Sequence, residues 1–259
     1  APYRGPETLT AIQLAASGGE GGEGAEAGGE GGEAAAAGGE GGEGGEGGEG
    51  GEGGSAAAGL NADQSYLFNL AMMKGHLRAG YELLEQDAYK DAVVHFRHPV
   101  EEIYSGIESE LEARGVEGFK DDLAELVEAT EAQDHGKAEH ALYHVLEYVN
   151  AAENAVSPEY TSKPSFIIPV VGALLKQSAA EYDAAIKDGR FSNLAEYQDS
   201  RGFIMVGRDM IGGMASKLHG QSAADLNDTI SAYGDLMAAW PSIVPDFEPK
   251  MTPGEVQAA

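Results

Sequence analysis

The stretch from His95 to Glu102 holds the densest set of metal-binding side chains in a chain that has only seven histidines. His95, His98 and Glu102 are separated by three and four residues, so on a helix they project from one face. Two imidazoles and a carboxylate can bind a transition metal such as iron, copper or zinc. The spacing therefore predicts a metal site on a helix.

A helical hairpin would bring a further imidazole to this stretch. Hydrophobic periodicity predicts helices at about 63–86 and 90–113, joined by a turn near Ala88. Counting back from that turn along antiparallel helices places Glu102 level with His76, in the interior of a bundle. The expected metal ligands are His76, His95, His98 and Glu102.

The rest of the chain after residue 60 also has helical periodicity, which predicts an all-α bundle of about seven helices. Pro99 must kink its helix or restart it, because proline lacks the amide proton and clashes with the preceding turn. The tail from Pro241 contains several prolines and is expected to be irregular. The remaining helices are expected at about 117–132, 136–156, 168–187, 191–218 and 222–240.

A faint internal repeat relates the two halves of the helical region. Adding 101 to each position, without gaps, aligns Tyr81 with Tyr182 and Asp87 with Asp188. It also aligns His98 with Asp199, so the second half has carboxylates where the first has imidazoles. We therefore expect two degenerate repeats. The predicted divisions are a docking segment (1–17), a low-complexity linker (18–59), a first bundle (60–157) and a second helical half with the tail (158–259).

The tract 18–54 repeats Gly-Gly-Glu with a period of three, which is typical of a flexible polyanionic linker. An ordered extended helix with packed glycines is the alternative reading. The formal net charge is −28, and removing the ten glutamates of the tract leaves −18. Such acidity argues against nucleic acid as a partner and favours cations, although a halophilic source would produce it without any ligand.

The chain contains no cysteine, so thiolate metal sites and disulfides are excluded. It starts at Ala1 without a methionine, which is the pattern of an exported protein after removal of its signal peptide. The longest apolar run, 166–175, is too short to span a bilayer. We expect a periplasmic or extracellular protein that does not span the membrane.

A second candidate metal site lies in the predicted helix 136–156. Its stretch Tyr143-His144-Val145-Leu146-Glu147-Tyr148 resembles the His-x-x-Glu motif of the imelysin-like family. The resemblance implies an exported helical bundle linked to iron uptake. It also implies that His144 and Glu147 contact a metal ion.

These observations predict a metal-binding protein that acts in metal uptake or delivery, with a membrane transporter as a possible partner. One alternative is a structural surface protein that assembles through residues 1–54, and another is a haem carrier that uses paired histidines. Nucleophile motifs, a nucleotide-binding glycine loop and paired Glu-x-x-His motifs are missing from the sequence, so nothing in it supports an enzyme.

Overall fold

The computed structural model describes residues 54–215, 221–246 and 248–259, and this part of the chain is all-α, as predicted. It belongs to one compact unit. Its strands are two residues long and form one hairpin, β1 (Ile186–Lys187) with β2 (Arg190–Phe191). The predicted docking segment and most of the Gly-Gly-Glu tract lie outside the described residues. The helical elements are α2 (Ala62–Leu84), α3 (Tyr89–His98), the π-helical turn η1 (Pro99–Ile103), α4 (Tyr104–Ala113), α5 (Lys120–Glu131), α6 (His135–Asn154), α7 (Pro158–Thr161), α8 (Pro164–Ala184), α9 (Leu194–Ala215), α10 (Gln221–Leu236), the 3₁₀ turn η2 (Met237–Ala239) and α11 (Pro253–Ala258).

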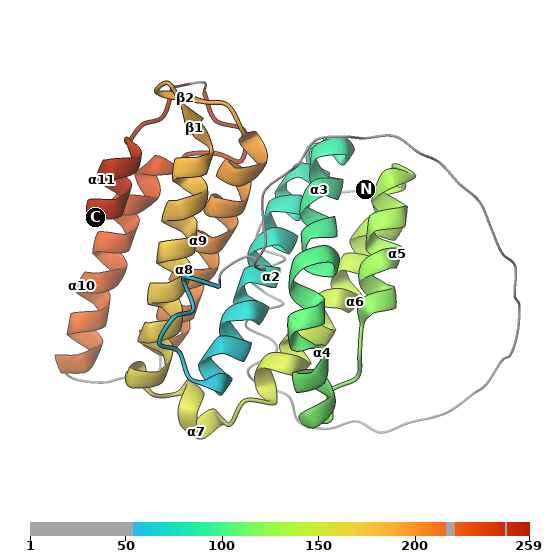
Figure 1. Ribbon diagram of the computed structural model, residues 1–259, viewed down its shortest axis with the longest axis horizontal. Coiled ribbons are helices and arrows are strands. Elements are labelled where there is room, and N and C mark those ends of the chain that lie inside the picture. The colour runs from blue at the N-terminus through green and yellow to red at the C-terminus, as the bar shows by residue number, and fades with distance from the viewer. Residues whose placement is uncertain (1–53, 216–220, 247) are drawn as a thin grey trace, which may run out of the picture. The chain divides into compact units, whose positions relative to one another are not determined.

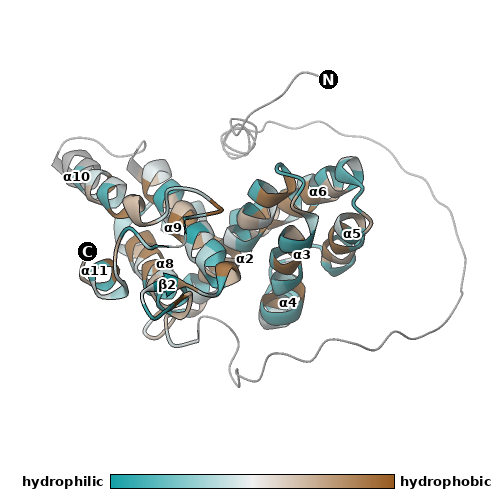
Figure 2. Ribbon diagram, turned by 90° about the horizontal axis from the view of Figure 1, so that it is seen from above, coloured by the Kyte–Doolittle hydropathy of each residue, from teal (hydrophilic) through white to brown (hydrophobic). Residues whose placement is uncertain are grey.

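Helix α2 is the central element of the described bundle (Figure 1). It packs against α3 and α6 on one side and against α8 and α9 on the other. The hydropathy view shows hydrophobic residues on the helix faces that point toward neighbouring helices (Figure 2). Helix α2 is buried along most of its length because apolar residues follow one another around the whole helix, from Tyr66 to Leu84. Two polar residues of α2, Gln64 and His76, are therefore buried in the protein.

The two halves share a helical hairpin, as the repeat predicts. Helices α2 and α3 in the first half correspond to α8 and α9 in the second. The turn residues Asp87 and Asp188, which the shift of 101 aligns, both adopt the left-handed conformation, with φ of 56° and 53°. Asp87 ends α2 in a Schellman motif, in which Ala88 N donates to Leu83 O. Asp188 and Gly189 instead form the tight turn of the β1–β2 hairpin.

Several helix boundaries differ from the prediction. Helix α2 is capped by Asn61 instead of Asp63, because the Asn61 and Gln64 side chains exchange hydrogen bonds with each other's backbone N–H. Helix α8 begins at Pro164, since proline is favoured in a first helical turn, and continues through Pro169. The tail is irregular after Trp240 but ends in the short helix α11.

The predicted register of the first hairpin was wrong. Glu102 was expected beside His76, but the structure places His98 there, with 3.4 Å between the two Nδ1 atoms. The reason is that the hairpin pairs residues about Asp87, whereas a pairing of His76 with Glu102 would be centred on Tyr89, two residues later. Gly80 does permit a close helix approach, although its neighbour is Phe96, with which a Cβ at position 80 would collide.

Candidate metal centre

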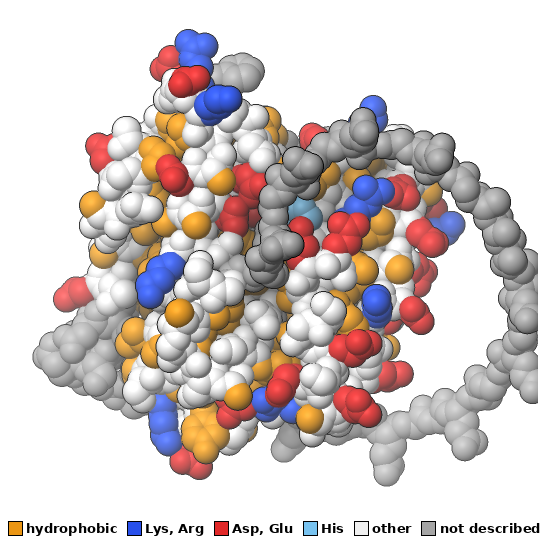
Figure 3. Space-filling model, viewed as in Figure 1, with side chains coloured by type: hydrophobic (Ala, Val, Ile, Leu, Met, Phe, Trp, Pro, Cys, Tyr) orange, Lys and Arg blue, Asp and Glu red, His pale blue; other side chains and the backbone are white. Residues whose placement is uncertain are grey.

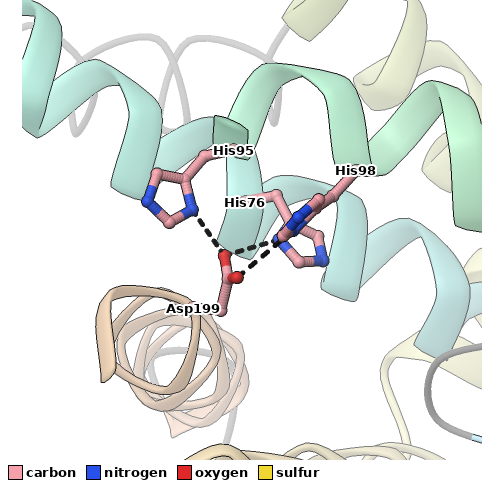
Figure 4. A group of neighbouring side chains, drawn as sticks. All are labelled: His76, His95, His98 and Asp199. Carbon is pink, nitrogen blue, oxygen red and sulfur yellow. Dashed lines mark hydrogen bonds and ion pairs between the residues drawn. The ribbon is translucent and has the colours of Figure 1, made fainter. Parts of the chain in front are cut away.

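Four side chains from three helices converge at the interface of α2, α3 and α9 (Figure 4). The Nδ1 atoms of His76 and His95 lie 2.6 and 2.7 Å from Oδ1 of Asp199. The Nδ1 atom of His98 lies 3.2 Å from the other carboxylate oxygen, Oδ2. One possible ligand atom from each residue lies within 4.8 Å of all the others. The group is a His₃Asp cluster, and we refer to it as the buried cluster.

A close helix crossing brings the buried cluster together. A Cβ at Gly202 of α9 would collide with the backbone carbonyl of Gly75 on α2, so the two backbones are in direct contact there. His76 follows Gly75 directly, and Asp199 precedes Gly202 by three residues, on the same side of α9. The absence of a side chain at both glycines therefore allows the imidazole to reach the carboxylate.

Gln198 orients the ring of His95. The His95 Nε2 atom lies 2.8 Å from Oε1 of Gln198, and the amide nitrogen of Gln198 donates to the carbonyl of Ile243 at 3.3 Å. That second bond assigns the amide orientation, so Oε1 faces the histidine and can only accept. His95 Nε2 must then carry a proton. A metal ligand needs a ring nitrogen without a proton, so an ion bound at Nδ1 would replace the proton that Nδ1 donates to Asp199 in the metal-free protein.

The charges in the buried cluster stabilise one another. Burial by itself would raise the pKa of Asp199, but the charges and hydrogen bonds of His76 and His95 outweigh it and hold this pKa well below its usual value. Burial lowers the pKa of His98, and the nearby Asp199 carboxylate outweighs this effect, so the pKa is raised overall. The carboxylate is therefore ionised at neutral pH, which a cation site requires.

The geometry fits a transition metal ion. Ligand atoms about 2.0–2.1 Å from a tetrahedral metal are about 3.3 Å apart. The close contacts in the buried cluster are 2.6 to 3.4 Å, and one candidate ligand atom from each of the four residues lies within 4.8 Å of all the others. Oδ2 of Asp199 is buried, and within the described residues it has no hydrogen bond of normal geometry. A buried carboxylate oxygen without such a bond is costly, and a cation would satisfy it. His76, His95 and Asp199 are fully buried, whereas the His98 side chain is 19% exposed.

Glu102, the fourth predicted ligand, is not part of the buried cluster. The residue is exposed and lies in η1, where the backbone forms a π-helical turn. The π turn changes which residues share a face, and Glu102 lies outside the group formed by His76, His95, His98 and Asp199. Pro99 at its start has no N–H to donate, which accounts for the departure from α-helical hydrogen bonding. Glu102 still acts at longer range, since its charge helps to raise the pKa of His98.

The sequence did not identify Asp199 as a principal ligand. Acidic residues are abundant in this chain, and nothing in the residues around Asp199 distinguishes it from the others. The one available signal was the repeat, which aligns Asp199 with His98.

The second candidate site lies elsewhere, on the exposed side of α6. His144 Nδ1 is 3.5 Å from Oε2 of Glu147, and their side chains are 45% and 53% exposed. The Nε2 atom of His144 faces His140 instead, at 3.3 Å from its Nε2. The two predicted ligands are thus neighbours on one helix, but the Glu147 carboxylate faces the Nδ1 side of the His144 ring.

Comparison with known proteins relates the second half of the chain to iron uptake. Residues 157–259 match the family described as the iron permease-associated 4-helix bundle domain. The matched stretch covers α7 to α11 and contains Asp199 and Gln198, whereas the three histidines of the buried cluster precede it. No curated protein and no solved structure matches the chain. In the described residues, each helix is too short or too polar to cross a membrane.

Proposed function

We propose that this protein binds a transition metal ion in the buried cluster and takes part in iron uptake together with a membrane permease. The observation that carries the proposal is the convergence of three histidine Nδ1 atoms on one buried, ionised carboxylate. An apolar bundle core gains nothing from four such groups unless they bind something, because each loses its hydration on burial. The match to an iron permease-associated domain makes iron the first candidate.

The ligand set narrows the choice of metal. Three imidazole nitrogens and one carboxylate oxygen suit borderline divalent ions such as Fe²⁺, Zn²⁺ and Cu²⁺ better than Ca²⁺ or Mg²⁺, which prefer oxygen ligands. The iron would be cargo, and the residues of this chain would bind it, exclude water and hold it in one coordination geometry. Gln198 would keep the proton of His95 on Nε2, away from the ion.

The surroundings of His98 favour the arrival of a cation. His98 is the ligand that reaches solvent, and Glu101 and Glu102 next to it in η1 are exposed. On the face shown in Figure 3, acidic side chains are spread over the α3, α4 and α5 side of the protein. Negative potential at a site raises the local concentration of cations and their rate of association. We infer an exported carrier that loads through the His98 side and passes iron to the permease.

The resemblance to the imelysin-like family belongs to this proposal as well. It rests on His144 and Glu147, and it agrees with the domain match in pointing to iron uptake.

Metal titration of the full chain tests the proposal. Purified apoprotein is titrated anaerobically with Fe²⁺, and separately with Zn²⁺ and Cu²⁺, and bound metal is counted by elemental analysis after desalting. We expect the His95→Ala/His98→Ala variant to lose one tightly bound equivalent that the wild type retains. Circular dichroism shows whether the variant is folded. A folded variant that binds as much metal as the wild type, with equal affinity, would refute the site.

A further inference from the structure

His140 and His144 form a pair on the outer face of α6. Their Nε2 atoms are 3.3 Å apart, and the rings are nearly perpendicular, with centroids 4.5 Å apart. Nitrogen ligands about 2.0–2.1 Å from a metal with tetrahedral angles are about 3.3 Å apart. A hydrogen bond between two ring nitrogens is usually shorter than 3.3 Å, so a hydrogen bond between His140 and His144 would be a weak one. The spacing therefore matches a two-nitrogen chelate.

The helix holds this spacing rigidly. The two histidines are separated by four residues, which places them one turn apart on the same face. The opposite face of α6 is anchored in the core by residues such as Leu142, Val145 and Val149, and it packs against α5 and α2. Because the backbone is fixed, little entropy is lost when an ion binds to both rings.

Glu147 completes the arrangement from the third position on this face. Its carboxylate lies on the Nδ1 side of His144, at 3.5 Å, and so favours the tautomer with the proton on Nδ1. The lone pair of His144 is then on Nε2, the atom that faces His140. A carboxylate that orients a histidine in this way is the usual outer partner of a metal ligand. Glu147 is therefore a positioning residue rather than a ligand.

We propose that His140 and His144 form a second metal site, which binds a divalent transition ion such as Cu²⁺, Ni²⁺ or Zn²⁺ through both Nε2 atoms. Binding displaces the proton held between the rings. A neutral His140 keeps that proton by carrying it on Nδ1, and a proton is released to solvent only when one of the rings is charged before the ion binds. Two imidazoles fill only part of the coordination sphere, and water or another ligand supplies the rest. His140 is exposed and His144 half-buried, so this site exchanges its ion readily with solvent.

The site does not depend on the proposed role of the buried cluster. No residue is common to the two sites. The α6 site lacks a fully buried ligand, and we expect it to bind more weakly and to follow the general order in which Cu²⁺ binds tightest.

The test is a Cu²⁺ and Zn²⁺ titration of the full chain by calorimetry, with three variants. His140→Ala is expected to lose one weak equivalent while keeping the tight one. His95→Ala/His98→Ala is expected to lose the tight equivalent while keeping the weak one. Glu147→Gln should keep the weak equivalent with about tenfold lower affinity, because it removes only the orienting carboxylate.

His135→Ala is the matched control. His135 lies in the first turn of the same helix and is also partly exposed, but its neighbours are the carboxylates of Glu85 and Asp87. This variant should bind as the wild type does. A second readout is the thermal midpoint, which excess Zn²⁺ should raise more for the wild type than for His140→Ala. Equal weak binding by the wild type and His140→Ala would overturn the α6 site and leave the buried cluster unaffected.

Discussion

His98 Nδ1 and Asp199 Oδ2 lie 3.2 Å apart, although the two residues hold equivalent positions in the two halves of the chain. The shift of 101 that relates them also relates the left-handed turn residues Asp87 and Asp188. If the halves were identical, two imidazoles or two carboxylates would face each other here, and when charged they would repel. The buried cluster therefore depends on how the repeats have diverged, with a base in one and an acid in the other.

Replacing the carboxylate should abolish tight metal binding. Asp199→Asn removes the one anionic ligand and leaves His76 and His95 without their charged partner. We expect metal affinity to fall at least about 100-fold and the apoprotein to lose about 3–5 kcal/mol of stability. Metal titration and urea unfolding measure the two effects. Asp209→Asn breaks a partly exposed pair with Arg78 and should cost no more than about 1 kcal/mol.

The glycine crossing of α2 and α9 should not tolerate a side chain. Gly202→Ala places a methyl group against the backbone of Gly75, which cannot rotate away as a side chain would. We expect a loss of about 1–3 kcal/mol or more, together with weaker metal binding, since His76 and Asp199 are displaced from each other. Gly212→Ala is the control in the same helix, because a Cβ there meets nothing within 4 Å. It should be neutral or slightly stabilising in thermal unfolding.

Glu102 and His98 should differ sharply in their effect on metal binding. His98→Ala removes a ligand of the buried cluster, and we expect the tight equivalent to be lost or greatly weakened. Glu102→Gln removes only a nearby charge, so it should keep the stoichiometry and reduce affinity by a few-fold at most at physiological ionic strength. Side-by-side titrations would decide. Equal losses in the two variants would mean that the π-helical turn rearranges and brings Glu102 to the ion.

Metal binding should weaken as the pH falls through the histidine range. An imidazole binds metal through a deprotonated nitrogen, so protons compete with the ion and are released when it binds. Because the Asp199 carboxylate outweighs burial and raises the pKa of His98 above its usual value of 6.5, we expect affinity to decline as the pH falls from neutral through the histidine range. Titrations in two buffers of different ionisation enthalpy would also count the released protons. Affinity that is constant from neutral pH to pH 5 would rule out histidine ligation.

Buried tyrosines should make the fold sensitive to alkali. Burial raises the pKa of Tyr66 and of Tyr182 to about 12, and their hydroxyls donate to the carbonyls of Ala152 and Met251. A raised folded-state pKa favours the protonated form, so this stabilisation is complete below about pH 10, the unfolded pKa, and is lost as the pH rises towards 12. Urea unfolding at increasing pH, with tyrosinate absorbance, should show stability falling across that window. Tyr66→Phe should reduce the fall.

The helices could be predicted from the sequence because the spacing of apolar residues within each segment is enough to indicate a helix. The pairing of α2 with α3 could be predicted only approximately, since a shift of two residues in the centre of the hairpin, from Tyr89 to Asp87, decides whether Glu102 or His98 lies beside His76. The π-helical turn at Pro99 was foreseen only as a disturbance, because its type depends on how the surrounding helices pack.

Asp199 shows where prediction from sequence stops. The contact between His76 and Asp199 spans 123 residues, and it exists because two glycines let α2 and α9 touch. The sequence around Gly75 and around Gly202 does not indicate that the two glycines are in contact. Gln198 was missed for the same reason, since its role depends on the position of the His95 ring and of the Ile243 carbonyl.

The π-helical turn also changes how the two halves can evolve. Its extra residue rotates everything that follows by about 100° relative to the unbroken helix α9. Beyond it, Gly106 and Gly207 are equivalent in sequence but differ in surroundings: a Cβ at 106 would meet nothing within 4 Å, whereas one at 207 would collide with the Tyr233 hydroxyl. Selection is therefore expected to allow many residues at position 106 and fewer at position 207, where the Tyr233 side chain would have to move.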